Sequence, residues 1–249
     1  MANMTSSAPA AQVAAELGSA PFEEIQLLVD RYREDPRVQV QKACERALKR
    51  WSKEKAEHER VDGMYRLMDE LGGSGIVVGV DEVGRGSVAG PLTVCAVCLP
   101  SDPKIWGIND SKQLTPAKRE ALASRIAQEA VAIGTCHISP ERIDSAVADT
   151  GLEPDCVLMD GNPLGAVPNE RDVVHGDAQV ACIAAASIVA KVTRDEMMVE
   201  LDAEYPGYHL AQSKGYASPD HIKAIQEHGL TPIHRVSFCG NFLQTGTLF

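Results

Sequence analysis

The stretch "IVVGVDEVGRG", residues 76–86, predicts how the main domain of this chain begins. Its run Ile76–Val80 is short, apolar and largely β-branched, which is typical of a buried strand. Two adjacent carboxylates follow, Asp81 and Glu82, and then a glycine-rich cationic turn, residues 84–86. Unpaired buried charge is costly, so a buried strand that ends in two negative charges indicates a functional site at its end.

Downstream of this stretch, strand-like and helix-like segments alternate, which predicts an α/β domain. The connections between the first three strands are too short for a crossover helix or hold one helix only, so we expect a mixed sheet that is antiparallel at first. The expected strands are 76–82, 91–99, 131–138, 155–160 and 171–175.

Three helices are expected to begin where a capping residue precedes a proline. The longest helix is expected over about 178–204, and its apolar segment "ACIAAASIVAK" indicates burial against the sheet. The three capped starts are Thr115-Pro116, Ser139-Pro140 and Ser218-Pro219.

The residues before the main domain divide into two parts. We expect residues 1–20 to be a disordered leader and 21–73 a helical N-terminal extension, with the catalytic domain over 74–249. Glycines at 72, 73 and 75 mark that boundary. Residues 31–66 hold eleven Lys/Arg and seven Asp/Glu, so this segment is near +4 and the remainder near −15 of the total −11.

Composition narrows the class of protein. A net charge of −11 argues against a polycation that coats nucleic acid. No run approaches the ~18–20 apolar residues that a membrane span needs. Seven cysteines, an odd number scattered through apolar segments, indicate reduced thiols. We therefore expect a cytoplasmic protein without a membrane partner.

Four acidic residues end apolar segments: Asp81, Glu82, Asp160 in "VLMDGN" and Asp177 in "HGDAQ". Carboxylates that converge in this way need counter-charges, and divalent cations such as Mg²⁺ supply them through oxygen ligands. Two such ions about 4 Å apart can activate a water and stabilise the leaving oxygen of a phosphodiester. The pattern predicts a metal-dependent phosphodiester hydrolase.

Each of these acids also has a structural interpretation. An aspartate at a strand end is often a turn residue, and Asp177 can cap the long helix. Neighbours on a strand point to opposite faces, so Asp81 and Glu82 face one site only if the strand ends or twists there. We expect Asp81 to bind metal directly and Glu82 to reach round the strand end or use its backbone carbonyl.

Five motifs in order strengthen the metal-site interpretation: "GVDEVGRGSVAGPL", "DSKQLT", "VLMDGNP", "GDAQVACIAAASIVAKVTRDEMM" and "KGYASPDH". Together they resemble the ribonuclease HII family, the type 2 ribonucleases H of bacteria. The resemblance implies a ribonuclease H-like fold that uses Mg²⁺ or Mn²⁺. It implies hydrolysis of the RNA strand of RNA–DNA hybrids and nicking of DNA 5′ of an embedded ribonucleotide. Its metal ligands match Asp81, Glu82, Asp160 and Asp177.

The resemblance also implies substrate-binding residues. The backbone of Gly84, Arg85 and Gly86 is expected to contact the ribose 2′-hydroxyl, the sugar group that distinguishes RNA from DNA. Tyr216 is expected to stack on the sugar of the next deoxynucleotide, and Lys112 to contact a phosphate.

Three residues of the long helix, Ser187, Lys191 and Arg194, are spaced by four and three, which predicts one helix face. That face is expected to present donors to phosphates. The alternative is that Lys191 and Arg194 pair with acidic neighbours such as Asp195.

Two regions depart from the family pattern or extend it. About fifteen residues are missing near 144–154, where the family has a helix that covers one sheet face. Their loss exposes apolar surface unless another element fills in. The tail "NFLQTGTLF" ends in Gln244 and Leu248-Phe249, loosely like peptides that bind sliding clamps.

Two other functions stay open from the sequence. One is a hybrid-binding protein that has lost turnover through the shortened segment. The other is a ribonuclease HIII-like enzyme, although that family's N-terminal domain contains a sheet and residues 21–71 have a helical pattern.

Overall fold

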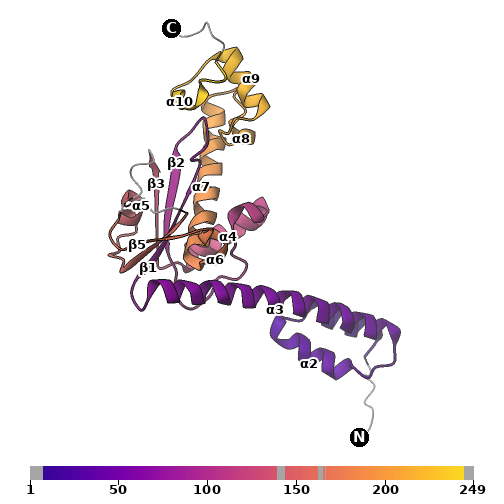
Figure 1. The fold of residues 1–249 in the computed structure, drawn as a ribbon. Helices are drawn as coiled ribbons and strands as arrows, with labels where there is room; N and C mark the ends of the chain where they lie inside the picture. Colours follow the sequence, from indigo (N-terminus) through magenta and orange to yellow (C-terminus); the bar gives the residue numbers. More distant parts are fainter. Residues whose placement is uncertain (1–7, 139–143, 162–164, 166, 244–249) are drawn as a thin grey trace. The chain divides into compact units, whose positions relative to one another are not determined.

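A computed structural model describes residues 8–138, 144–161, 165 and 167–243 (Figure 1). The chain forms two compact units, Met1–Asp62 and Gly63–Phe249. The predicted clamp-binding tail and the predicted helix start at Ser139-Pro140 lie outside the described residues. None of the described helices is both long and apolar enough to span a bilayer.

The N-terminal unit is helical, as expected, but its helices begin earlier than the sequence pattern indicated. The expectation of a disordered leader is wrong for residues 10–19, which form helix α1, Ala10–Ser19. Alanine favours helix, and Val13 and Leu17, one turn apart, are both buried. The guanidinium of Arg50 donates to carbonyls at the end of α1, including that of Ala20 at 2.7 Å.

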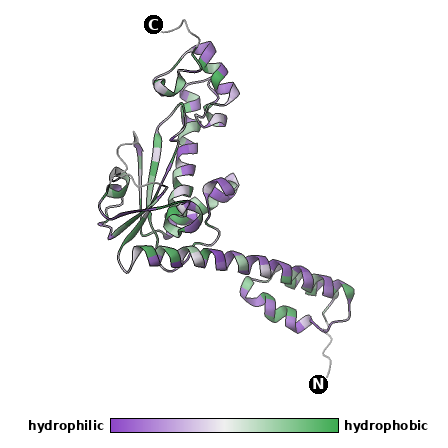
Figure 2. Ribbon diagram, in the orientation of Figure 1, coloured by the Kyte–Doolittle hydropathy of each residue, from purple (hydrophilic) through white to green (hydrophobic). Residues whose placement is uncertain are grey.

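Two further helices complete this unit, α2 (Phe22–Tyr32) and the first part of α3 (Val38–Gly72). Just before α3 begins, the Asp35 carboxylate accepts hydrogen bonds from the backbone and side chain of Arg37. The division between the two compact units falls inside α3, between Asp62 and Gly63. Figure 2 shows hydrophilic residues along much of α3.

The second unit contains a five-stranded mixed sheet in the order β3-β2-β1-β4-β5. As predicted, the first three strands are antiparallel, and β4 and β5 run parallel to β1. The strands closely follow the predicted segments: β1 Val77–Val83, β2 Leu92–Cys98, β3 Ala132–Ile138, β4 Cys156–Asp160 and β5 Glu170–Val173.

One face of the sheet packs against the predicted long helix, which has a break. Helix α6 (Gly176–Gln179) precedes α7 (Ala181–Glu204), and Val180 between them is extended. A Cβ built on Gly79 of β1 would lie 2.3 Å from the backbone carbon of Cys182, so strand and helix meet backbone to backbone. Only glycine permits this approach.

The opposite face packs against helix α5 (Asp144–Asp149), the short segment where the sequence predicted missing residues. Ala146 and Val147 are buried together with sheet residues such as Val78, Val94 and Met159. The sequence left two outcomes for the shortened segment, exposed apolar surface or another element that covers the sheet. The structure shows the second, because α5 covers this sheet face. The core residues of the face are buried, not exposed.

Five short or medium-length helices remain among the described residues of the second unit. Two of them begin as the sequence predicted, since Thr115 caps α4 and Ser218 caps α9. These elements are η1 (Ser111–Gln113), α4 (Pro116–Glu129), α8 (Leu210–Ser213), α9 (Pro219–His228) and α10 (Val236–Cys239).

The close contact between β1 and α7 gives a test of the fold. We expect Gly79→Ala to destabilise the protein by about 3 kcal/mol or more, since overpacking against rigid backbone cannot relax. Gly63→Ala in α3 is the matched control, because its Cβ would meet only a side-chain nitrogen at 4.0 Å. It should leave stability unchanged or raise it by up to about 1 kcal/mol. Thermal unfolding of both variants checks this. Equal melting temperatures for Gly79→Ala and Gly63→Ala would contradict the close backbone contact between β1 and α7.

Candidate active site

Three carboxylates meet where β1, β4 and α6 come together. Strand register places Asp160 beside Asp81, because Val80 pairs with Met159 in parallel. Asp177 comes from α6. One carboxylate oxygen from each lies within 4.8 Å of the others. Three of the four predicted metal ligands are thus brought together from distant parts of the chain.

The electrostatics of this group favour a cation. Burial raises the pKa of Asp81 to about 8, and the negative charges of Glu82 and Asp160 add to that effect, while a hydrogen bond from Ser187 opposes it. The pKa of Asp177 is also raised, first by burial and then by Asp160. Buried like charges are relieved by a divalent ion with oxygen ligands. The donor set therefore fits Mg²⁺ or Mn²⁺.

Glu82 does not join the group formed by the three aspartates. Its Oε1 instead pairs with Nε of Arg85 at 3.0 Å. The pKa of Glu82 is raised, mainly by burial and also by Asp160, while Arg85 opposes this shift. Its predicted role as a metal ligand stays a prediction.

Asp160 and Asp177 are held by neighbouring groups. The backbone N–H of Gly176 donates to Asp160 Oδ1 at 2.7 Å. The ammonium of Lys112 lies 3.7 Å from Asp177 Oδ2 and is otherwise well exposed. Burial works against charge on Lys112, but the surrounding aspartates outweigh it and raise its pKa. Lys112 is thus cationic at the rim of the acidic group.

Ser187 lies inside the site and not on an exposed helix face. Its side chain is buried, and its Oγ lies within hydrogen-bonding distance of Ser111 Oγ, at 2.9 Å. It also lowers the pKa of Asp81 through a hydrogen bond. The structure therefore connects Ser187 to the carboxylates. A phosphate could contact Ser187 directly only if the residues that cover its side chain moved away.

The glycine-rich turn after β1 rests on Arg194, which is fully buried. Gly84 has φ of +96°, and a Cβ on it would lie 2.2 Å from Nε of Arg194. The Arg194 guanidinium donates to Ser87 Oγ at 2.9 Å, and Ser87 Oγ donates in turn to the Gly84 carbonyl at 2.8 Å. Arg194 therefore supports the turn from a buried position, and no ion pair joins it to an acid among the described residues.

The same arginine reaches the loop that carries Tyr216. Its Nη1 donates to the Lys214 carbonyl at 2.7 Å, and its guanidinium lies 5.7 Å from the centre of the Tyr216 ring. The N–H groups of Val88 and Ala89 both donate to the Gly215 carbonyl. The turn and the tyrosine are therefore fixed relative to each other, with Gly86 and the Tyr216 ring exposed.

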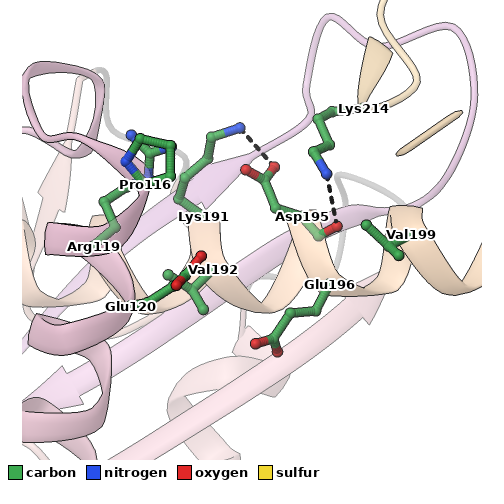
Figure 3. A pocket seen from close by; sticks show the side chains of 9 residues that line it. All are labelled: Pro116, Arg119, Glu120, Lys191, Val192, Asp195, Glu196, Val199 and Lys214. Atoms are coloured by element: carbon green, nitrogen blue, oxygen red, sulfur yellow. Dashed lines mark hydrogen bonds and ion pairs between the residues drawn. The ribbon is translucent and has the colours of Figure 1, made fainter. Parts of the chain in front are cut away.

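Lys191 lines a cavity of about 450 Å³ between α4 and α7, drawn in Figure 3. Its ammonium pairs with Asp195 at 2.7 Å, the alternative that the sequence left open. Lys214 donates to the backbone carbonyl of the same Asp195 (Figure 3). Asp195 therefore holds two of the cations that line this cavity, Lys191 at its carboxylate and Lys214 at its backbone carbonyl.

Sequence reasoning missed two groups that shape the site. Arg235 donates to the carbonyls of Arg85 and Gly90, so it holds both ends of the glycine-rich segment. Nothing in its local sequence "IHRVSF" indicates this contact. Asp110, which helps to raise the pKa of Asp177, stands directly before the quoted motif serine and could have been found there.

Comparison with known proteins agrees with this geometry. A family model described as Ribonuclease HII matches residues 78–241, and one described as Ribonuclease HII N-terminal domain matches residues 10–70. A Ribonuclease HII of Geobacillus thermodenitrificans is 42% identical over 221 residues, covering 83% of this chain and 85% of the relative. One of Lachnoclostridium phytofermentans is 42% identical over 227 residues, covering 85% and 89%.

Among solved structures, the ribonuclease H2 of Pyrococcus horikoshii OT3 superposes with a TM-score of 0.55 at 25% identity, over 67% of this chain and 96% of the other. The fold and its acidic centre thus define a ribonuclease H, a metal-dependent hydrolase. Within that class, the chain belongs to the ribonuclease HII family. Membership in this family favours ribonuclease HII over the ribonuclease HIII-like alternative.

The raised pKa of Asp81 gives a prediction about stability. Its folded pKa of about 8 lies above the ordinary value near 3.9, so the unfolded state loses its proton first. Stability therefore falls as pH rises through this window. We expect Asp81→Asn to stabilise the metal-free protein at pH 7, by on the order of 2–4 kcal/mol, and hardly at all at pH 4.

Thermal melts in a chelator measure this effect, with exposed Asp172→Asn as the control. Mg²⁺ or Mn²⁺ should raise the melting temperature of the wild type and leave that of Asp81→Asn nearly unchanged. A destabilised Asp81→Asn protein at pH 7 would contradict the buried-charge argument.

Proposed function

We propose that this protein nicks double-stranded DNA on the 5′ side of an embedded ribonucleotide and also degrades the RNA strand of RNA–DNA hybrids, with Mg²⁺ or Mn²⁺. The observation that carries the proposal is the approach of Asp81, Asp160 and Asp177 within 4.8 Å beside a glycine turn with exposed backbone. In this proposal the three carboxylates serve hydrolysis, and the glycine turn serves recognition of one sugar hydroxyl.

In the proposed reaction, water attacks phosphorus and the bond to the 3′-oxygen of the upstream deoxynucleotide breaks. The products are a 3′-hydroxyl and a 5′-phosphate on the ribonucleotide. Two bound cations would neutralise the carboxylates and lower the pKa of a water. Asp81, Asp160 and Asp177 would hold them, with Glu82 as a further ligand. Lys112 and Lys191 bind flanking phosphates, and Ser187 orients Asp81.

Recognition is assigned to the turn and the tyrosine that Arg194 supports. Gly84 is required by the fold, whereas a Cβ on Gly86 would meet no protein atom within 4 Å. Open space at an exposed glycine leaves room for a ligand to approach the backbone. Gly84, Arg85 and Gly86 contact the 2′-hydroxyl, and the exposed Tyr216 ring stacks on the next deoxyribose.

A duplex containing one ribonucleotide is the informative substrate for this proposal. With Mg²⁺ or Mn²⁺ the wild type should produce a single nick 5′ of the ribonucleotide. Asp81→Asn should slow the nick by at least about 10³-fold, because it removes a ligand of the cations. Gel analysis of the end-labelled strand measures both, with Asp172→Asn as the control. Cleavage of long hybrids alone, without the single-ribonucleotide nick, would contradict the proposed substrate.

The two glycines of the turn should respond differently to alanine. We expect Gly86→Ala to melt like the wild type and to lower kcat/KM for the single-ribonucleotide duplex at least about 10-fold, because its methyl group occupies the space of the sugar. Gly240→Ala is the matched control, since Gly240 is also exposed with nothing near its Cβ position. Gly84→Ala should lower the melting temperature itself. Full activity of Gly86→Ala would remove this turn from recognition.

A further inference from the structure

The chain that leads out of the glycine-rich turn is held by residues 231–235, which join α9 to α10 (Figure 1). The backbone of His234 pairs with that of Ala89 in an antiparallel bridge. Two backbone hydrogen bonds, at 2.8 and 2.9 Å, flank this bridge and join residues 233–235 to residues 88–90. The shape of the 231–235 segment therefore decides where the end of the turn lies.

The side chain of His234 fixes that shape. Its Nδ1 lies 3.0 Å from the backbone nitrogen of Thr231 and 2.8 Å from the Thr231 hydroxyl oxygen. A backbone N–H can only donate, so Nδ1 is the acceptor and the ring proton is on Nε2. The His234 backbone N–H donates in return to the Thr231 carbonyl at 3.0 Å. A tight turn between the two residues is thus closed from both sides.

The surroundings of the His234 ring keep it neutral and in place. The residue is only 6% exposed, and its ring lies 5.1 Å from that of Tyr208 and 5.3 Å from that of His221, between centroids. Burial lowers the pKa of His234 to about 4, and the neighbouring His221 adds to this shift. At pH 7 the ring is therefore uncharged, as an acceptor at Nδ1 has to be.

The second ring nitrogen shows why a histidine at this position calls for an explanation. Nε2 of His234 is buried and has no hydrogen-bond partner among the described residues. A buried polar atom without a partner destabilises the fold, and an apolar side chain of similar size would avoid that cost. The acceptor at Nδ1 is the feature that an apolar side chain could not provide.

The residue next to His234 reaches the turn itself. The guanidinium of Arg235 donates to the Arg85 carbonyl at 2.9 Å and to the Gly90 carbonyl at 2.9 Å. Because Arg235 follows His234 directly, the closed turn at Thr231 sets where this side chain starts. A change in the 231–235 segment would therefore move both the backbone ladder and the guanidinium that hold the glycine-rich turn.

We propose that His234 is a positioning residue for ribonucleotide recognition. Its Nδ1 holds the 231–235 segment in the form that keeps the backbone of residues 84–86 aligned for a sugar hydroxyl. Because His234 is buried, it acts through Arg235 and residues 88–90 and not by touching the substrate. The inference rests on the proposed function, which assigns residues 84–86 to recognition.

The test places the same amide group at the position of each ring nitrogen in turn. In His234→Asn the side-chain oxygen can take the place of Nδ1 and accept from Thr231. In His234→Gln the amide extends to the place of Nε2, and Thr231 is left without its acceptor. Ile225→Val is the control for lost stability, because it shortens a side chain of the same core cluster and removes no hydrogen bond from the 231–235 segment. All variants are made in the full-length chain.

The first readout is hydrogen exchange of the backbone amides in residues 84–90, measured by mass spectrometry without substrate. We expect exchange in His234→Gln to be at least about 5-fold faster than in the wild type, because the loss of one hydrogen bond corresponds to roughly that factor. Exchange in His234→Asn and in Ile225→Val should stay within about 2-fold of the wild type.

The second readout is nicking of the single-ribonucleotide duplex with Mg²⁺ or Mn²⁺, at a temperature well below every melting transition. His234→Gln should lower kcat at least about 10-fold with a smaller change in KM, since a displaced turn misplaces the reacting phosphate. The kcat of His234→Asn should stay within about 3-fold of the wild-type value. The melting temperatures of all variants are measured in parallel.

The outcomes separate this inference from the proposed function. If kcat and exchange simply follow melting temperature across the variants, or if His234→Asn folds and behaves like His234→Gln, the inference is overturned. It is also overturned, while the proposed function stands, if the wild type nicks the duplex and His234→Gln matches it in both readouts. If the wild type makes no nick but exchange rises in His234→Gln alone, the proposed function fails and the positioning of the turn by His234 stands.

Discussion

The backbone contact between Gly79 of β1 and the first turn of α7 is the constraint on which the second unit depends. It sets the distance between strand and helix at the point where Asp81 leaves β1 and Asp177 precedes α7. Farther along α7, the same packing places Arg194 beneath the turn that follows β1. A larger residue at position 79 would therefore displace the carboxylates and the turn together.

Electrostatics and packing oppose each other at this site. Burial of Asp81 and Asp177 raises the pKa of each, so the folded protein carries carboxylates that it does not easily ionise. The buried Arg194 costs desolvation too, but carbonyl and hydroxyl acceptors surround its guanidinium. The arginine is satisfied within the chain, while the acids are left for an ion. The charge of Arg194 thus serves the fold, whereas the charges of the aspartates are available to bind a cation.

Much of the fold could be predicted from the sequence because its signals are local. The β-branched runs gave the strands, and the Thr115 and Ser218 caps gave two helix starts. The convergence of Asp81, Asp160 and Asp177 was predictable because each ends an apolar segment. What failed depends on tertiary contacts. Helix α1 needs the core around Val13, and the role of Arg194 follows from carbonyls more than a hundred residues away.

The final turns of α3 are part of the second unit and not of the first. Met64, Tyr65 and Met68 are buried, and the Tyr65 hydroxyl accepts from the backbone N–H of Ile105 at 3.0 Å. A single helix is thus shared between two modules. A shortened protein that contains only the catalytic unit therefore has to keep this piece of helix. A truncation at the glycine-rich residues 72–75 would remove buried side chains from the core of that unit.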